Sequence, residues 1–256
     1  MIASVAEGLR LQFKLFRSDP ALLLSVLGGP LQGLVLASVA RGSSAPEVAA
    51  SIIVACFLIS MWLQALWTAG DLVNSDRWNL RLEQVLATPA SYVGLLTGRI
   101  VGAVAIGSLS LVGAAVIVAL FLPTAPLRFD GGLLVGAALL TGTATLGMGL
   151  IFAAGFVFTR ASDVLQVSLT FPFFVLGGLA VPVASLPIWA QIPANVVYLN
   201  WSSQLLRAAF GSPLSSGIVA PAAWLAAISA AQLLVGGLLV RRVIDQARRT
   251  AALTRG

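Results

Sequence analysis

Few side chains in this sequence are suited to covalent chemistry. The chain has no histidine and a single cysteine, Cys56, which lies inside an apolar stretch. Metal sites built on histidine or cysteine, and a disulfide within the chain, are therefore excluded. Without clustered acids or histidines, the sequence predicts neither an enzyme nor a cofactor bound by this chain. The acidic residues lie at the ends of apolar stretches or between them: Glu7, Asp19, Glu47, Asp71, Asp76, Glu83, Asp130, Asp163 and Asp245.

The sequence also lacks the residues that would let the chain power transport alone. Carriers driven by proton or sodium gradients usually keep ionisable groups inside the membrane, and no acid of this chain falls at the middle of an apolar stretch. The single lysine, Lys14, follows no glycine-rich phosphate loop, so there is no ATP-binding P-loop. If the chain moves a solute, a separate subunit supplies the energy.

Six apolar stretches dominate the chain and predict an all-α integral membrane protein. Charged residues make up 9% of the sequence and the mean hydropathy is +0.99, against roughly 25% charged residues in a soluble domain. A crossing needs about 20 apolar residues, and continuous rather than alternating runs favour helices. The predicted transmembrane helices are residues 20–40, 48–70, 92–122, 133–158, 164–187 and 218–240, within one domain of residues 1–256.

Residues 1–18 predict an amphipathic interfacial helix on the inner membrane surface. Glu7, Arg10, Lys14 and Arg17 interrupt the apolar core that a signal peptide would need. Two interpretations stay open, a lipid anchor and a contact surface for a cytoplasmic partner. The apolar positions recur at helical spacing on the opposite face: Ile2, Ala6, Leu9, Phe13 and Phe16.

Basic residues are distributed unequally between the two sides of the predicted membrane domain. With six spans, twelve of the fifteen fall on the side of the termini, leaving Arg41, Arg128 and Arg207 on the other. The positive-inside rule then places both termini and the tail 241–256 in the cytoplasm of a cell whose plasma membrane holds the protein. Residues 182–213, rich in Pro, Trp, Asn and Ser, predict an external re-entrant or interfacial element after the fifth span. The net charge of +6 indicates topology and lipid contact rather than nucleic-acid binding.

The predicted cytoplasmic loop 71–91 contains the richest motif. Leu82, Val85, Leu86 and Pro89 recur at helical spacing with charges between them, which predicts a short amphipathic helix ending at the proline. This helix either connects two spans passively or is pushed by a soluble domain and tilts both.

The same loop resembles the cytoplasmic "LELLLATPVS" segment of ABC exporter permeases of the second type, a family of drug, polysaccharide and lipid exporters. Asp76-Arg77 corresponds to an acidic–arginine element upstream, while Leu80-Arg81 replaces the family's usual Gly-Thr. The matching positions are Leu82, Glu83, Leu86, Ala87, Thr88, Pro89 and Ser91.

A second match covers residues 171–207. The stretch from Phe171 to Trp189 resembles the family's "F-x-SG-x-x-x-P-x-x-x-LP-x-W" pattern, with Gly177 in place of the serine. The stretch that ends at Arg207 resembles the following "P-x-x-x…R" element. The two matches occur in the family's order, with its number of spans between them, so the resemblance covers essentially the whole chain.

The resemblance implies a permease that pairs with a second copy of itself or with a homologous permease. Two separate cytoplasmic ATPase subunits would bind to the pair and hold ATP and magnesium. The residues expected to couple this chain to the ATPase are Asp76, Arg77, Leu82, Glu83, Leu86, Pro89, Arg10 and Lys14. The residues expected to line a substrate path between the second and fifth spans are Phe57, Met61, Gln64, Phe171, Phe174 and Leu176.

The expected function is therefore that of the transmembrane subunit of an ATP-driven exporter. Its substrate would be apolar or amphipathic, such as an antibiotic or other drug, a natural product or a lipid-like compound, because the predicted path has no fixed charge. The alternative is a non-transporting membrane scaffold or sensory subunit of an ATPase complex. Gln32, Gln64 and Gln232 lie inside spans, where they either line a path or bond across helices.

Overall fold

Helices account for the regular structure of the ranges that the computed structural model describes: residues 2–18, 20–42, 45–78, 92–123, 128–157, 162–179, 183, 186–212 and 217–253. These ranges contain no strand. The helices are α1 (Ile2–Ser18), α2 (Pro20–Val39), α3 (Pro46–Trp78), α5 (Tyr92–Phe121), α6 (Gly131–Val157), α7 (Ser162–Leu176), α8 (Ile188–Ala194), α9 (Tyr198–Ala209) and α10 (Val219–Leu253).

Four helices in the described part of the chain are long and apolar enough to cross a membrane. They are Pro46–Trp67 in α3, Val93–Phe121 in α5, Gly131–Val157 in α6 and Val219–Gln246 in α10. Two shorter apolar helices are Leu27–Val39 in α2 and Val164–Leu176 in α7. The prediction of a multi-pass, all-helical membrane protein is thus confirmed, whereas the count of six spans stays a prediction.

The prediction of one span over residues 164–187 is wrong in its second half, because α7 ends at Leu176. Gly178 adopts a left-handed backbone with φ of +68°. The Leu179 amide donates to the Phe174 carbonyl at 3.2 Å, and the Gly178 amide to Val175 at 3.1 Å. This pattern is a Schellman motif, which closes a helix at a glycine. Two adjacent glycines in an apolar run therefore stopped a helix that hydropathy alone would continue.

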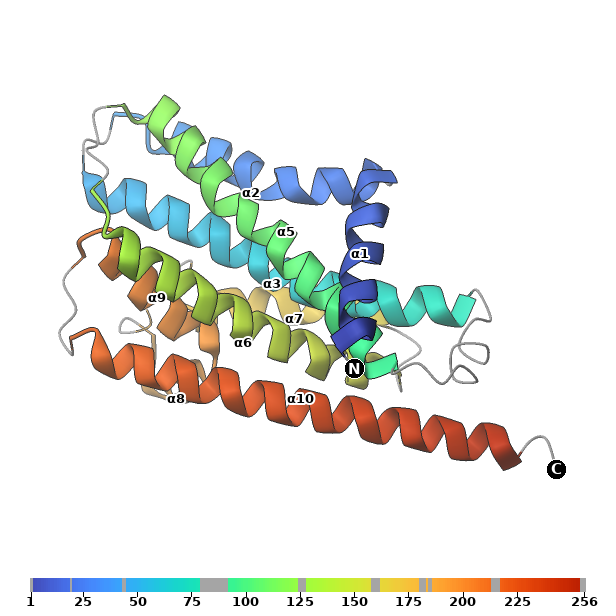
Figure 1. Cartoon of the computed structure of the whole chain (residues 1–256). Helices are drawn as coiled ribbons and strands as arrows, with labels where there is room; N and C mark the ends of the chain where they lie inside the picture. The colour runs from blue at the N-terminus through green and yellow to red at the C-terminus, as the bar shows by residue number, and fades with distance from the viewer. Residues whose placement is uncertain are drawn as a thin grey trace.

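The helix ends fall into two groups (Figure 1). The N-terminus of α1, the polar end of α3, the first turns of α5 and the C-terminal end of α10 lie together at one end of the molecule. The connections from α2 to α3 and from α5 to α6, and the start of α10, lie at the other end. Unlike the long helices, α1 runs across the bundle. This grouping is the one that the basic residues predict, although the sidedness of the membrane is untested.

Helix α3 forms the centre of the core. Phe57, Met61 and Trp62 are at most 1% exposed, and α3 packs against α2, α5, α6, α7 and α9. Helices α6 and α10 pair through small residues: a Cβ on Gly147 would lie 2.8 Å from the backbone nitrogen of Leu233. Close backbone approach at small residues is the usual way in which membrane helices associate.

Candidate functional site

Helix α1 crosses the start of α5 through glycines on both helices. A Cβ on Gly8 would collide with the carbonyl oxygen of Leu95, and a Cβ on Gly98 would collide with the carbonyl oxygen of Val5. The two backbones are therefore in direct contact, with no side chain between them. We call this contact the α1–α5 crossing.

The buried face of α1 differs from the apolar face that the sequence analysis assigned to lipid. Ser4, Gly8 and Gln12, spaced four residues apart, are buried, whereas Phe13 is 44% exposed. Hydropathy missed this face because its residues are small or polar. A signal was nevertheless present in α5, where glycine recurs every four residues: Gly94, Gly98 and Gly102.

The structure describes only part of the predicted ATPase-coupling set. Arg10 and Lys14 are exposed on α1. Asp76 and Arg77 lie in the last turns of α3, whose backbone is helical through Trp78, and their side chains are not among the described ones. The remaining members lie outside the described residues, so their role stays a prediction: Leu82, Glu83, Leu86 and Pro89.

The predicted substrate-path residues lie in three different surroundings. Phe57 and Met61 belong to the buried core of the single subunit, and Phe174 and Leu176 pack against the same cluster. Phe171 points outward and is 70% exposed. Gln64 instead lines a cavity between α2 and α3. The path assignment is untested and stays a prediction.

Helices α3 and α7 meet through aromatic rings. Trp62 stacks on Phe173, with ring centroids 4.2 Å apart and planes at 21°, and meets the edge of Phe152 at 5.4 Å. Gln166, two turns before Phe173 and on the same face of α7, is fully buried. Within the described part of the chain, neither its amide nitrogen nor its amide oxygen has a hydrogen-bond partner, and the Trp62 indole N–H also lacks one. We call this region the α3–α7 contact.

Two positions that are distant in the sequence meet at the end of α7. The Arg207 guanidinium on α9 donates through Nη2 to the carbonyl oxygen of Gly178 at 3.0 Å. A positive charge at the C-terminal end of a helix also interacts favourably with the helix dipole. Both residues belong to the sequence stretch that resembles ABC exporter permeases, so the fold joins the two halves of that stretch.

The polar segment after α7 forms two short helices, α8 and α9, and α9 packs against α3, α6 and α10. The sequence suggests an external interfacial segment. Tyr198 nevertheless lies inside the protein, 1% exposed, and its hydroxyl shares a 3.2 Å hydrogen bond with Thr145. Trp201 lies closer to the surface, donating to the carbonyl of Asn195 at 2.8 Å.

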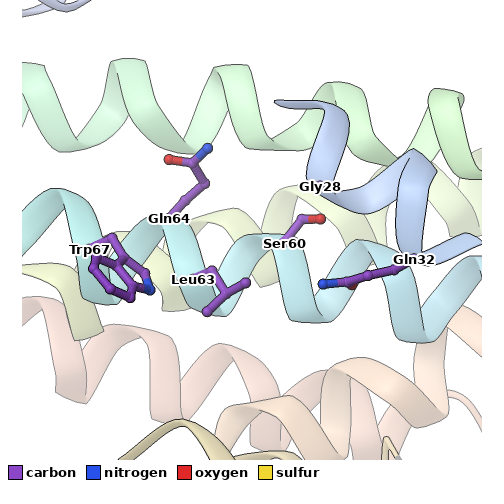
Figure 2. Close-up of a pocket in the computed structure, with 6 residues that line it drawn as sticks. All are labelled: Gly28, Gln32, Ser60, Leu63, Gln64 and Trp67. Carbon is purple, nitrogen blue, oxygen red and sulfur yellow. The ribbon is translucent and has the colours of Figure 1, made fainter. Parts of the chain in front are cut away.

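The intramembrane glutamines differ in their surroundings. Gln232 bonds across helices, with its amide nitrogen 3.9 Å from the sulfur of Met148. Gln32 and Gln64 line the same cavity between α2 and α3 (Figure 2). Bonding across helices is thus observed for Gln232, while a role of Gln32 and Gln64 in a substrate path stays a prediction.

A comparison with known protein families identifies the family of this chain. The family described as ABC-2 type transporter matches residues 8–210, and the chain belongs to this family. It is therefore the membrane-spanning permease part of an ABC transporter and not itself the catalytic part. Permeases of this family work with ATPase subunits. The comparison with curated proteins gives no match.

Proposed function

We propose that this chain is the transmembrane subunit of an ATP-driven exporter that moves an apolar or amphipathic compound out of the cell. Two copies, or one copy and a homologous permease, face each other and bind two cytoplasmic ATPase subunits. The expected substrates are drugs including antibiotics, natural products and lipid-like compounds.

The observation that carries this proposal is the convergence of three segments at one end of the molecule. Helix α3 continues without a break from its apolar stretch to Trp78, and α5 begins at Tyr92. Both helices therefore lead to residues 79–91, the stretch that resembles the permeases' cytoplasmic segment. Helix α1, with Arg10 and Lys14 exposed, crosses the same end of α5 (Figure 1).

This convergence supports a mechanical role. An ATPase pair that closes on ATP shifts the permease only if it binds one permease state more tightly than the other. A subunit docked on residues 79–91 would act on the segment that connects α3 to α5, and the same subunit docked on α1 would act on α5 through the α1–α5 crossing. Because the backbones of α1 and α5 are in direct contact at the α1–α5 crossing, a displacement of α1 would move α5 with it.

The test compares two acidic residues: Glu83, in the stretch 79–91 that follows α3 in the sequence, and Glu47, in the first turn of α3. The full chain is reconstituted with its ATPase subunits, and export of the uncharged fluorescent amphiphile Nile red is measured together with ATP hydrolysis. We expect Glu83→Ala to abolish most export and to remove the response of hydrolysis to the dye. Loss of one partner of a buried interfacial charge pair costs about 2–5 kcal/mol. Glu47→Ala is the matched control, since Glu47 is exposed in the first turn of α3.

Two results would contradict the proposal. Wild-type export by Glu83→Ala would make residues 79–91 a passive connection. A wild-type complex whose ATP hydrolysis responds to no amphiphile and which exports none would favour the scaffold or sensory subunit instead.

A further inference from the structure

A cavity of about 270 Å³ lies between α2 and α3. Gly28 and Gln32 line it from α2, and Ser60, Leu63, Gln64 and Trp67 line it from α3 (Figure 2). The stem of Gln64 reaches toward α5, where a Cβ on Gly107 would meet its Cγ at 2.9 Å. The cavity is separate from the predicted path residues of α7.

Two neighbouring glycines explain why the cavity exists. At Gly29 the helices touch: a Cβ there would lie 2.7 Å from Ser60 Oγ and 2.7 Å from Ser110 Cβ. One residue earlier, a Cβ on Gly28 would meet nothing within 4 Å. Gly29 thus lets α2 lie against α3 and α5, and Gly28 leaves space beside that contact.

The lining is mostly apolar and carries no charge, and its polar side chains are Gln32, Ser60 and Gln64. Within the described residues, the buried amide oxygen of Gln32 has no hydrogen-bond partner. In the described conformation this oxygen is enclosed by protein, but the terminal torsion of a glutamine turns easily. A turned amide would present its oxygen to a ligand hydroxyl or amide N–H in the cavity, which would remove the cost of an unpaired polar group in an apolar medium. A fixed ligand charge would find no counter-charge among the lining side chains.

The position of the cavity indicates the side from which a ligand arrives. The α3 residues that line it lie in the last part of the apolar stretch Pro46–Trp67. Trp67, at the end of that stretch, is 43% exposed, and the polar segment beyond it is the one that the sequence predicts to be cytoplasmic. The volume is below the roughly 300–1,000 Å³ of a site for a whole drug-sized ligand, which indicates a site for part of a larger molecule.

From this geometry we propose that the cavity is a binding site for the uncharged, hydrogen-bonding head of an amphiphile taken from the inner leaflet. The hydroxyl or amide head lies against Gln32 and Ser60, and the apolar tail extends past Leu63 and Trp67 into lipid. Its role in substrate uptake rests on the export function proposed above, whereas its ability to bind such a head does not.

The test is photolabelling of the full chain in vesicles made from cells that produce it. The probe is an alkyl glucoside with a diazirine in its chain, and labelled residues are mapped by mass spectrometry. We expect labelling at residues 60–67 that saturates and that excess octyl glucoside displaces. Gly28→Leu should lower it by about tenfold, since the new side chain fills the space that the head needs. Gly136→Leu is the control, because a Cβ on Gly136 also meets nothing within 4 Å and lies far along the chain on α6.

A second variant tests the hydrogen bond without filling the cavity. Gln32→Leu should reduce the preference for the glucoside over a head-free diazirine alkane by about threefold to tenfold, the effect of losing one hydrogen bond. Equal labelling in the Gly28→Leu and Gly136→Leu variants would overturn the site. Equal labelling by the head-free alkane would show an apolar lipid crevice only, and stronger labelling by an alkyl phosphate would overturn the uncharged head.

The labelling is independent of ATPase binding, so its failure and the failure of the export function are distinguishable. Normal labelling in a complex that exports no amphiphile would support the binding site and contradict its role in substrate uptake. Lost labelling with normal export of Nile red by Gly28→Leu would exclude the cavity from the export route of that dye.

Discussion

The α1–α5 crossing and the α3–α7 contact are two ways of joining helices in the same membrane protein. At the crossing, Gly8 and Gly98 bring backbone against backbone, so that a single added methyl group cannot fit. At the contact, large rings stack and the fully buried Gln166 has no hydrogen-bond partner among the described residues. The α1–α5 crossing therefore permits only one packing of its two helices. The α3–α7 contact leaves the Gln166 amide without a hydrogen-bond partner, and a different position of α7 would be able to supply one.

This difference assigns different roles to the two joints. A close backbone contact transmits movement because it cannot slide without a clash. A buried amide without a hydrogen-bond partner raises the free energy of the state that contains it by about 1–3 kcal/mol. A cost of this size brings the described position of α7 close in free energy to an alternative position in which the amide is paired. We therefore expect α1 and α5 to move together and α7 to move relative to α3.

Among the substitutions that change a side chain least, the largest loss of stability is expected at the crossing. Gly98→Ala should lower the free energy of unfolding by about 1–3 kcal/mol, because the new methyl group meets the backbone at Val5 and the helices must separate. The measurement is an SDS titration of the purified chain in mixed micelles. Gly237→Ala serves as the control, since a Cβ there meets nothing within 4 Å.

The reciprocal variant sharpens this test. Gly8 and Gly98 belong to one contact, so the Gly8→Ala, Gly98→Ala double variant should lose less stability than the sum of the single variants. Additive losses would mean that the two glycines act separately and that the crossing is not one joint.

An effect of opposite sign is expected at the α3–α7 contact. Gln166→Leu keeps the side-chain size and removes both unpaired polar atoms, so the unfolding free energy should rise by about 1–2 kcal/mol. Export should fall, since the described position of α7 becomes more stable than its alternative. Gln166→Ala controls for size and should destabilise by leaving a void. A loss of stability in Gln166→Leu would show that the amide is satisfied where it lies, through bound water for example.

The smallest effect is expected for Trp62→Phe. The substitution keeps an aromatic ring to stack on Phe173 and removes the unpaired indole N–H, so the two changes offset each other to within about 1 kcal/mol. Trp62→Ala, which removes the ring, should lose about 3–5 kcal/mol. Equal losses in both variants would show that the indole N–H matters more than the stacking.

The sequence predicts the long helices well, because lipid leaves few alternatives. A continuous apolar run must satisfy its own backbone, and α5 and α6 begin and end within two residues of the predicted spans. The end of α7 was not predicted, since Gly177 and Gly178 are as compatible with an apolar run as their neighbours. Only the left-handed backbone of Gly178 ends the helix.

The candidate sites are less predictable for a related reason. Glycine and serine contribute little to hydropathy, so the face of α1 that packs against α5 was not predicted, and the apolar face expected to lie on lipid stays a prediction. Gln32 and Gln232 are identical in type, and only the residues opposite them decide that one lines a cavity and the other approaches Met148. Glu83 lies outside the described residues, and its role rests on the sequence.

The hydrogen bond from Arg207 to Gly178 has a consequence for biogenesis. Helix α7 has 15 residues, fewer than the roughly 20 that a segment needs to insert by itself. The side chain that binds its C-terminal glycine is synthesised 29 residues later. During translation α7 therefore emerges before its binding partner, and we expect its stable insertion to depend on α9. We expect the fifth apolar stretch to insert as one unit with α9, so that a chain truncated before residue 207 should insert this stretch less completely than the full chain.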